Sequence, residues 1–96
     1  MIIAKVVGAA VASVKMEALQ ATKLLVVRQA DAQGTPTGAP FLAADLVGAG
    51  EGELVMVSQG STARVAMAND RSPVDAAIIG ILDSLSYDGE LVFRKA

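Results

Sequence analysis

The glycine-rich segment in the middle of the chain is the first place where chemistry could be expected. Residues 48–53 read Gly-Ala-Gly-Glu-Gly-Glu, which superficially matches the dinucleotide-binding fingerprint Gly-x-Gly-x-x-Gly. The third glycine of that fingerprint would stand where this chain has Glu53, and a long helix would follow, whereas here an apolar run follows. The segment therefore predicts a tight turn in which glycine permits positive φ and a close approach of the backbone.

Three aspartates, Asp45, Asp75 and Asp83, could supply a general acid and a general base. Such chemistry needs a cleft and a shifted pKa, and its usual proton shuttle, histidine, is absent from the chain. Cysteine is absent as well, which removes thiolate chemistry, a disulfide framework and the usual soft ligands of zinc. We therefore expect no enzyme, no metal and no cofactor, and we interpret the aspartates as solvent-facing or interface carboxylates. Asp75 and Asp83 flank the last expected strand, where Arg64 or Lys23 of another subunit could pair with them.

The segment Gly60-Ser61-Thr62-Ala63-Arg64 combines small hydroxyl residues with one cation. From the residues alone, it predicts a short helix that is capped by the hydroxyl of Ser61 or Thr62, followed by an exposed arginine.

Alternating and β-branched runs predict the strands that position these segments. A bend is expected at Gly8 in the first strand. The expected strands are Ile3–Val14, Lys23–Ala30, Phe41–Val47, Glu53–Ser58 and Val74–Leu85. The expected connections are a loop with a turn at Lys15–Thr22, an exposed hairpin connection at Asp31–Pro40, a loop at Gly48–Gly52 and a short helix at Ser61–Ala68.

Five or six short strands with one short helix and no helix-strand alternation predict an all-β fold. The expected architecture is a small closed five- to six-stranded OB-like barrel with one short helix. The chain has 96 residues and shows no internal repeat, so we expect a single domain over residues 1–96. In the tail, Asp88-Gly89 predicts a turn and Leu91–Phe93 an apolar strip.

The apolar content predicts assembly. Hydrophobic residues make up 53% of the chain although only 3% are aromatic, and a domain of this size hides little apolar surface by itself. The last expected strand is apolar on both faces, with Ile78 and Leu82 on one face and Ile79 and Ile81 on the other. Because one face of an antiparallel sheet usually meets water, the second apolar face predicts cover by another subunit.

Charge and targeting signals bound the remaining possibilities. The net charge of −2 argues against a polyanion binder. The alternative function, an OB-fold single-stranded nucleic-acid-binding module, needs basic grooves and aromatic platforms, and the chain offers only Phe41, Tyr87 and Phe93. A small-molecule-binding barrel has no specific feature in its favour. The start of the chain lacks a basic signal-peptide region and no apolar run is long enough to span a membrane, so we expect a cytoplasmic protein.

Four segments taken together resemble a known family. They are residues 23–27, 45–55, 60–64 and 73–83, and they resemble the vertex proteins of bacterial microcompartment shells, the EutN/CcmL type found in carboxysomes and metabolosomes. The match runs from Ile3 to about Asp83, and Thr62 stands where serine is commoner in the family. Residues 86–96 lie beyond the shared pattern and are expected to form a C-terminal extension.

The resemblance implies a structural protein whose pentamers cap the vertices of an icosahedral shell. The expected partners are four further copies of the chain and hexameric or pseudohexameric shell proteins, with no nucleic acid and no membrane. Such closed rings use two different patches on each copy. Ser61 and Thr62 are expected to line the axial pore. The expected subunit interface contains Asp45, Gly48, Gly50, Arg64, Ile79, Ile81 and Asp83.

Overall fold

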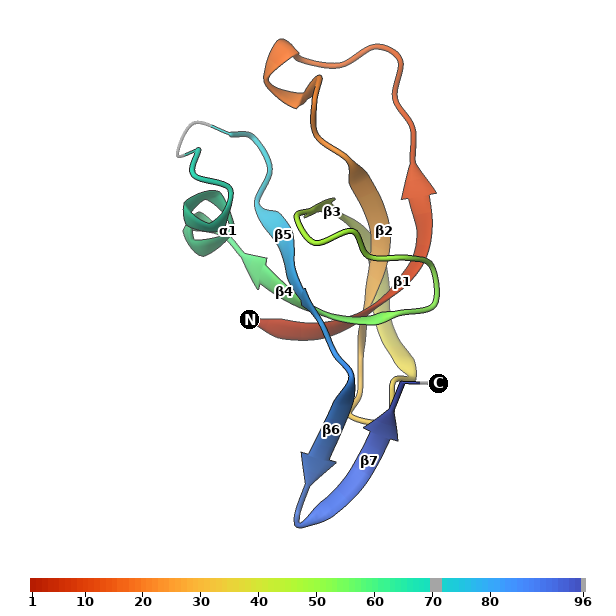
Figure 1. The fold of residues 1–96 in the computed structure, drawn as a ribbon. Coiled ribbons are helices and arrows are strands. Elements are labelled where there is room, and N and C mark those ends of the chain that lie inside the picture. The colour runs from red at the N-terminus through yellow and green to blue at the C-terminus, as the bar shows by residue number, and fades with distance from the viewer. Residues whose placement is uncertain (70–71, 96) are drawn as a thin grey trace.

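The structure is a computed structural model that describes residues 1–69 and 72–95. Its elements follow one another from the N-terminus to the C-terminus as Figure 1 shows. The strands are β1 (Ile2–Ala10), β2 (Leu24–Ala30), β3 (Pro36–Asp45), β4 (Leu54–Gln59), β5 (Ala76–Ile81), β6 (Ser84–Tyr87) and β7 (Glu90–Arg94). The helices are a single 3₁₀ turn, η1 (Glu17–Leu19), and one α-helix, α1 (Ser61–Ala66).

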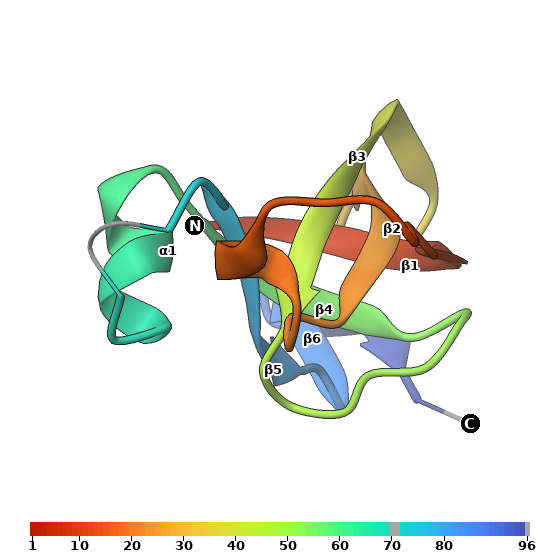
Figure 2. The same cartoon turned by 90° about the horizontal axis from the view of Figure 1, so that it is seen from above.

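The first five strands close into a barrel in the order β1-β2-β3-β5-β4. All neighbours in the barrel are antiparallel except β3 and β5, which pair in parallel at Ala44↔Ala77 and Asp45↔Ile78. Figure 2 shows α1 at one side of the barrel, beyond the ends of β4 and β5. The predicted all-β barrel with one short helix is confirmed.

Small aliphatic side chains fill the barrel. A five-stranded barrel is narrow, and inward-pointing alanine and valine match its width better than aromatic rings would. Ile78 is the largest fully buried side chain, and the half-buried Ile2, Phe41 and Ile81 pack against the same core. The buried cluster consists of Ala4, Val6, Leu25, Val27, Ala43, Ala49, Val55, Val57, Ala76 and Ile78.

Several expected strand boundaries are wrong, including the end of β3, which lies at Asp45 instead of Val47. The first strand ends at Ala10 instead of Val14, and Val11 and Val14 beyond it are almost fully exposed. The bend expected at Gly8 coincides with a register shift between Val6 and Gly8. In the expected connection 31–40, strand β3 already begins at Pro36, which leaves a turn of five residues.

Side-chain and backbone contacts explain that short turn. Asp31 Oδ1 accepts hydrogen bonds from the amides of Gln33 and Thr35, at 3.0 and 2.9 Å. Pro36 and Pro40 are tolerated because β3 pairs with β2 alone over this stretch, and proline is confined to such edges. Both prolines fall in the expected connection, but in the structure they belong to β3.

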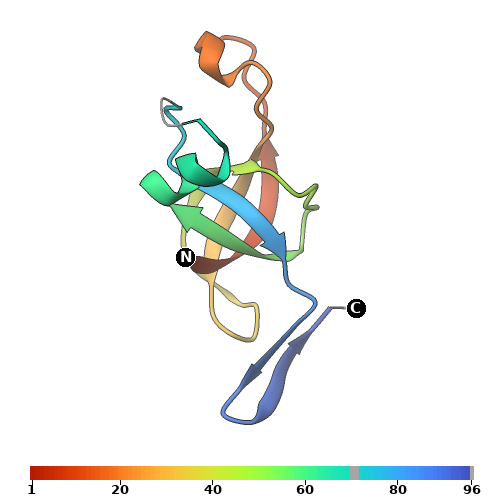
Figure 3. The ribbon, with the colours of Figure 1, turned by 60° about the vertical axis from the view of Figure 1, so that its left-hand side comes forward.

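The last expected strand, Val74–Leu85, is also wrong as a single element. It divides into β5, which completes the barrel, and β6, which leaves it. β6 pairs with β7 in a separate two-stranded sheet. The predicted turn is present, with Asp88 and Gly89 at φ 51° and 76°, as a two-residue hairpin turn requires. Figures 1 and 3 show this hairpin projecting from one end of the molecule, whose extents are 45 × 24 × 21 Å.

Candidate pore and subunit interface

The turn that precedes α1 carries the two expected pore residues. Gly60 is the helix N-cap, with φ 66°, and its amide donates to the carbonyl of Asp75 at 2.7 Å. The expected cap by Ser61 or Thr62 is therefore wrong. Thr62 Oγ1 instead donates to the carbonyl of Gln59 at 2.6 Å and accepts from Ser58 Oγ at 2.8 Å. The threonine hydroxyl thus ties the start of the helix back to the end of β4.

Ser61 and Thr62 are both exposed, but their hydroxyl groups are not equivalent. Within the described part of the chain, the Ser61 hydroxyl has no hydrogen-bond partner, while both functions of the Thr62 hydroxyl are used. A pore at this turn would be lined by an uncharged hydroxyl and by backbone, which gives no strong attraction for ions.

Asp45 organises the loop that follows β3. Its Oδ1 accepts hydrogen bonds from the amides of Val47, Gly48 and Ala49 at 3.0–3.1 Å, and its Oδ2 accepts a second one from Ala49 at 3.0 Å. Lys23 Nζ lies 3.9 Å from Oδ2, and the side chain of Asp45 is only 1% exposed. Several donors compensate for burial of the carboxylate. Asp45 therefore acts inside its own subunit and shapes the loop that a neighbour would meet.

The glycines of this loop have different reasons to be there. Gly48 and Gly52 have φ of 76° and 88°, a region that favours glycine. Gly50 instead donates its amide to Glu53 Oε1 at 2.6 Å, and a Cβ at Gly50 would lie 3.3 Å from that oxygen. The predicted tight turn with positive φ is confirmed.

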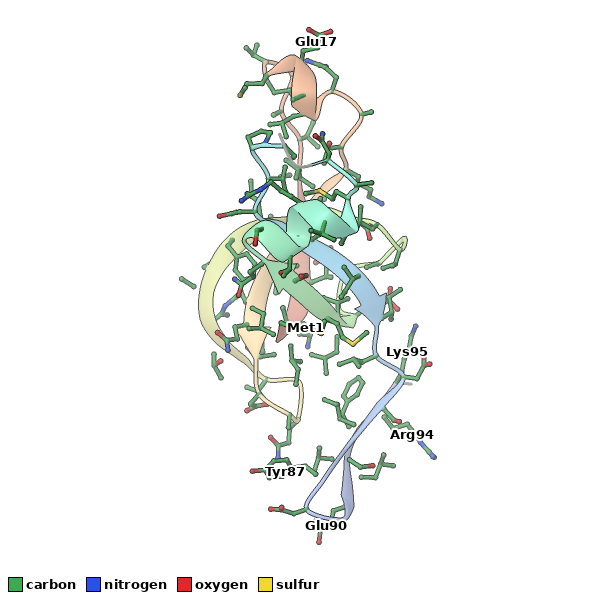
Figure 4. The ribbon with its side chains drawn as sticks, turned by 90° about the vertical axis from the view of Figure 1, so that its left-hand side faces the viewer. Met1, Glu17, Tyr87, Glu90, Arg94 and Lys95 are labelled. Atoms are coloured by element: carbon green, nitrogen blue, oxygen red, sulfur yellow. The ribbon has the colours of Figure 1, made fainter. Side chains whose placement is uncertain are left out.

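Glu53 links the loop to the projecting hairpin. Its Oε2 lies 2.6 Å from Lys95 Nζ, and the Lys95 amide donates to the carbonyl of Asp83 at 2.8 Å. The hydrogen bond from Lys95, followed by that from Gly50, lowers the pKa of Glu53, and the same pairing raises the pKa of Lys95. Figure 4 shows Lys95 at the barrel end of the hairpin, with Tyr87 and Glu90 at its far end. Sequence analysis did not identify this contact, because 42 positions separate two ordinary charged residues.

The expected interface residues lie in several places rather than in one cluster. Asp45, Gly48 and Gly50 belong to the loop after β3 and Arg64 to α1. Ile79 is half-buried on β5, while Ile81 packs against the core of its own barrel. Asp83 is exposed at the start of the hairpin. Figures 1 and 3 place α1 and the Gly48–Gly52 loop on opposite sides of the barrel.

Residues 1–69 and 72–95 contain no group of three acidic, histidine or cysteine side chains that could hold a metal ion. A hollow of about 180 Å³ is lined mainly by apolar side chains, namely Leu19, Leu24, Leu42, Pro73 and Val74, with Asp75. No helix in the described residues is long and apolar enough to cross a membrane.

Comparison with known proteins gives this geometry its context. The family described as "Ethanolamine utilisation protein EutN/carboxysome" matches residues 1–83. The bacterial microcompartment shell vertex protein EutN of Salmonella typhimurium is 44% identical over 93 residues, which are 97% of this chain and 94% of the relative. The chain belongs to the EutN/CcmL family.

Members of the EutN/CcmL family from different compartments resemble the chain to a similar degree. The carboxysome shell vertex protein CcmL of Synechococcus elongatus is 42% identical over 97% of this chain and 94% of its own length. The solved structure of GrpN from Rhodospirillum rubrum, a pentameric microcompartment shell protein, has a TM-score of 0.81 at 42% identity and covers 91% of this chain and 99% of GrpN. Like these relatives, the chain is a structural shell protein and not an enzyme.

The hairpin lies outside the family match but not outside every relative. The match ends at residue 83, whereas the alignment to EutN covers 93 of the 96 residues and so extends into β6 and β7. GrpN covers a smaller share of the chain. At least one relative of the EutN/CcmL family therefore matches residues of this hairpin.

Proposed function

We propose that five copies of this chain form a closed ring that caps a vertex of a bacterial microcompartment shell. The observation that carries the proposal is the likeness to a pentameric relative, GrpN, over 91% of the chain at 42% identity. The proposed neighbours in the shell are hexameric or pseudohexameric shell proteins, which meet the outer edges of the ring.

Exposed apolar side chains support an assembled state. Val65 on α1 is 79% exposed, and Leu42, Leu46 and Val47 are 40–48% exposed. They belong to different elements on different sides of the barrel. A ring that closes by rotation needs two different patches on each subunit, and such a distribution provides them.

Within this ring, we assign the expected residues to four roles. Ser61 and Thr62 line the axial pore, where the free Ser61 hydroxyl meets solvent and Thr62 holds the turn. Contacts between subunits come from Gly48, Gly50, Arg64, Ile79 and Asp83. Asp45 shapes the loop that makes such a contact, and Ile81 packs β5 against the core of its own barrel. The pore offers no fixed charge, so the proposed role of the ring is closure rather than selective transport.

The nucleic-acid alternative is not favoured by the structure. Stacking of bases needs aromatic side chains on one accessible surface. Phe41 packs against the barrel core, Phe93 lies against Gly34, and Tyr87 stands at the far end of the hairpin. The three aromatic residues therefore form no shared platform.

Shell formation in cells tests the proposal. The chain would be co-expressed with the hexameric shell proteins of one compartment, and the purified particles would be imaged by electron microscopy. With the chain present we expect closed polyhedral shells, and without it open or elongated ones. Equally closed shells in both samples would contradict a vertex-capping function.

A further inference from the structure

Arg64 has no electrostatic partner among the residues that the structure describes. The residue is half-buried on α1, and within the described residues its guanidinium takes part in no hydrogen bond or ion pair. Guanidinium groups offer five donors in a planar fork that suits a carboxylate. Val65 beside it is 79% exposed. We call this side of the molecule the α1 flank and define it by Ser61–Ala66. The α1 flank thus presents the guanidinium group of Arg64 next to the apolar side chain of Val65.

The opposite side of the barrel presents the carboxylate of Glu51 in a loop that also has exposed apolar side chains. We call residues 46–53 the loop flank. The loop flank has two glutamates, and Glu53 is engaged by Lys95 and by the Gly50 amide. Asp45, at the base of the loop flank, accepts hydrogen bonds from three backbone amides. Glu51 is exposed and has no partner in the described residues. Leu46 and Val47 are 45% and 40% exposed in the same loop.

The two flanks are placed as a ring contact requires. Figures 1 and 3 show α1 and the loop flank on opposite sides of the barrel and at a similar level along its long axis. In a ring whose rotation axis is parallel to that long axis, the α1 flank of one copy can face the loop flank of the next. The two flanks carry opposite charges, so a contact between them joins two different patches. Closed rings are built from such heterologous contacts.

We propose that Arg64 of each subunit pairs with Glu51 of the partner subunit, while Val65 packs near the partner's Leu46 and Val47. This inference rests on the proposed ring and adds its pairing and direction. The partner is a second copy of the chain, because charge and apolar surface on one flank complement those on the other. Opposite charges at matching positions fix the register of neighbours and penalise the reversed arrangement.

Charge reversal followed by rescue tests the pairing. Glu51→Arg and Arg64→Glu each place like charges together, so each single variant should raise the concentration at which the ring half-dissociates by about tenfold or more. The double variant restores opposite charges and should return that concentration toward the wild-type value. Native mass spectrometry over a dilution series gives the readout, and circular dichroism confirms that each variant is folded. Glu17→Arg is the matched control, because Glu17 stands at the far end of the molecule.

Cysteine cross-linking gives a second readout that depends on proximity rather than stability. The chain has no cysteine, so Glu51→Cys with Arg64→Cys introduces the only two thiols. A short bis-maleimide should then link the subunits into a ladder of up to five, whereas Glu17→Cys with Arg64→Cys should give no ladder.

The outcomes separate the pairing from the ring. Wild-type rings with undisturbed single variants, or single variants without rescue in the double variant, would overturn the pairing and leave the ring intact. A wild-type chain that forms no ring at all would overturn the proposed function and the pairing with it. Disruption, rescue and a cross-linked ladder together would support the inference.

Discussion

At the scale of residues, Asp45 has the clearest structural task. One carboxylate satisfies three consecutive amides in a loop that contains two glycines of positive φ. The pattern of an aspartate followed by glycine three positions later was a local signal for such a turn, because aspartate commonly accepts from amides just ahead of it. Within its own subunit, Asp45 therefore holds the loop flank in shape.

Removal of this carboxylate should destabilise the subunit. In Asp45→Ala, the amides of residues 47–49 lose their acceptor, and a hydrogen bond to a charged group makes a net contribution of about 1.5–3 kcal/mol to stability. Water can reach part of this exposed loop and replace some of the lost bonds. We expect a net loss of about 2–3 kcal/mol, seen as a lower midpoint in denaturant unfolding. Asp75→Ala is the control, because its carboxylate is exposed and takes part in no hydrogen bond or ion pair among the described residues. Equal midpoints for the two variants would contradict the role given to Asp45.

At the scale of elements, the β6–β7 hairpin depends on few contacts with the barrel. A two-stranded hairpin is marginally stable in water by itself. Here Phe93 lies against Gly34, and the Glu53–Lys95 pair joins the hairpin to the loop flank. The pair is partly solvated, with side chains 21% and 45% exposed, so it restrains the hairpin more than it stabilises the fold.

Loss of the pair should loosen the hairpin. In Glu53→Gln or Lys95→Gln, we expect faster hydrogen exchange at the amides of β6 and β7 with little change in the amides of the barrel. Glu90→Gln, at the hairpin's far end, should leave exchange unchanged. Similar exchange in all three variants would mean that Phe93 alone holds the hairpin.

The same pair gives a pH window. The pKa of Glu53 is lowered, so its contribution is present above its ordinary value of 4.5 and is lost as pH falls through the lower folded value. The pKa of Lys95 is raised, so its contribution is present below 10.5 and is lost as pH rises through the higher folded value. Hydrogen exchange in β6 and β7, corrected for intrinsic rates, should be slowest between these limits. A protection profile that is flat into the acid range would contradict the restraint.

Two isoleucines on β5 separate folding from assembly. Ile81 packs against the core of its own barrel, whereas Ile79 is half-buried outside the core cluster. We expect Ile81→Asp to lower subunit stability by several kcal/mol, since it buries a charge, and Ile79→Asp to weaken the ring while the subunit stays folded. Unfolding and oligomeric state would be measured on both. A folded, fully assembled Ile79→Asp variant would remove Ile79 from the proposed interface.

The sequence predicted the elements better than their ends. Strands β2 and β4 lie within a residue of their expected bounds, because alternation of apolar side chains reports directly on a barrel wall. The expected strand over Val74–Leu85 fails because its apolar pattern continues after the chain has left the barrel. The predicted helix cap by a hydroxyl group is wrong for Thr62, because its hydroxyl group is hydrogen-bonded to Ser58 and to the carbonyl of Gln59. Neither contact is visible in a local pattern, and the same holds for Glu53 and Lys95.

At the scale of the whole molecule, a small barrel serves as one subunit of the proposed ring. The barrel accounts for its own core, yet it leaves apolar side chains on both flanks and a hairpin that projects from one end. Membership in the EutN/CcmL family explains why this surface is present in a small chain. The high content of hydrophobic residues in the sequence is explained if the exposed ones form contacts between subunits.

Native mass spectrometry of the purified wild-type chain tests the central claim most directly. The account predicts a dominant species of five subunits at low micromolar concentration. A monomer under the same conditions, or a stable ring with any other number of subunits, would contradict it.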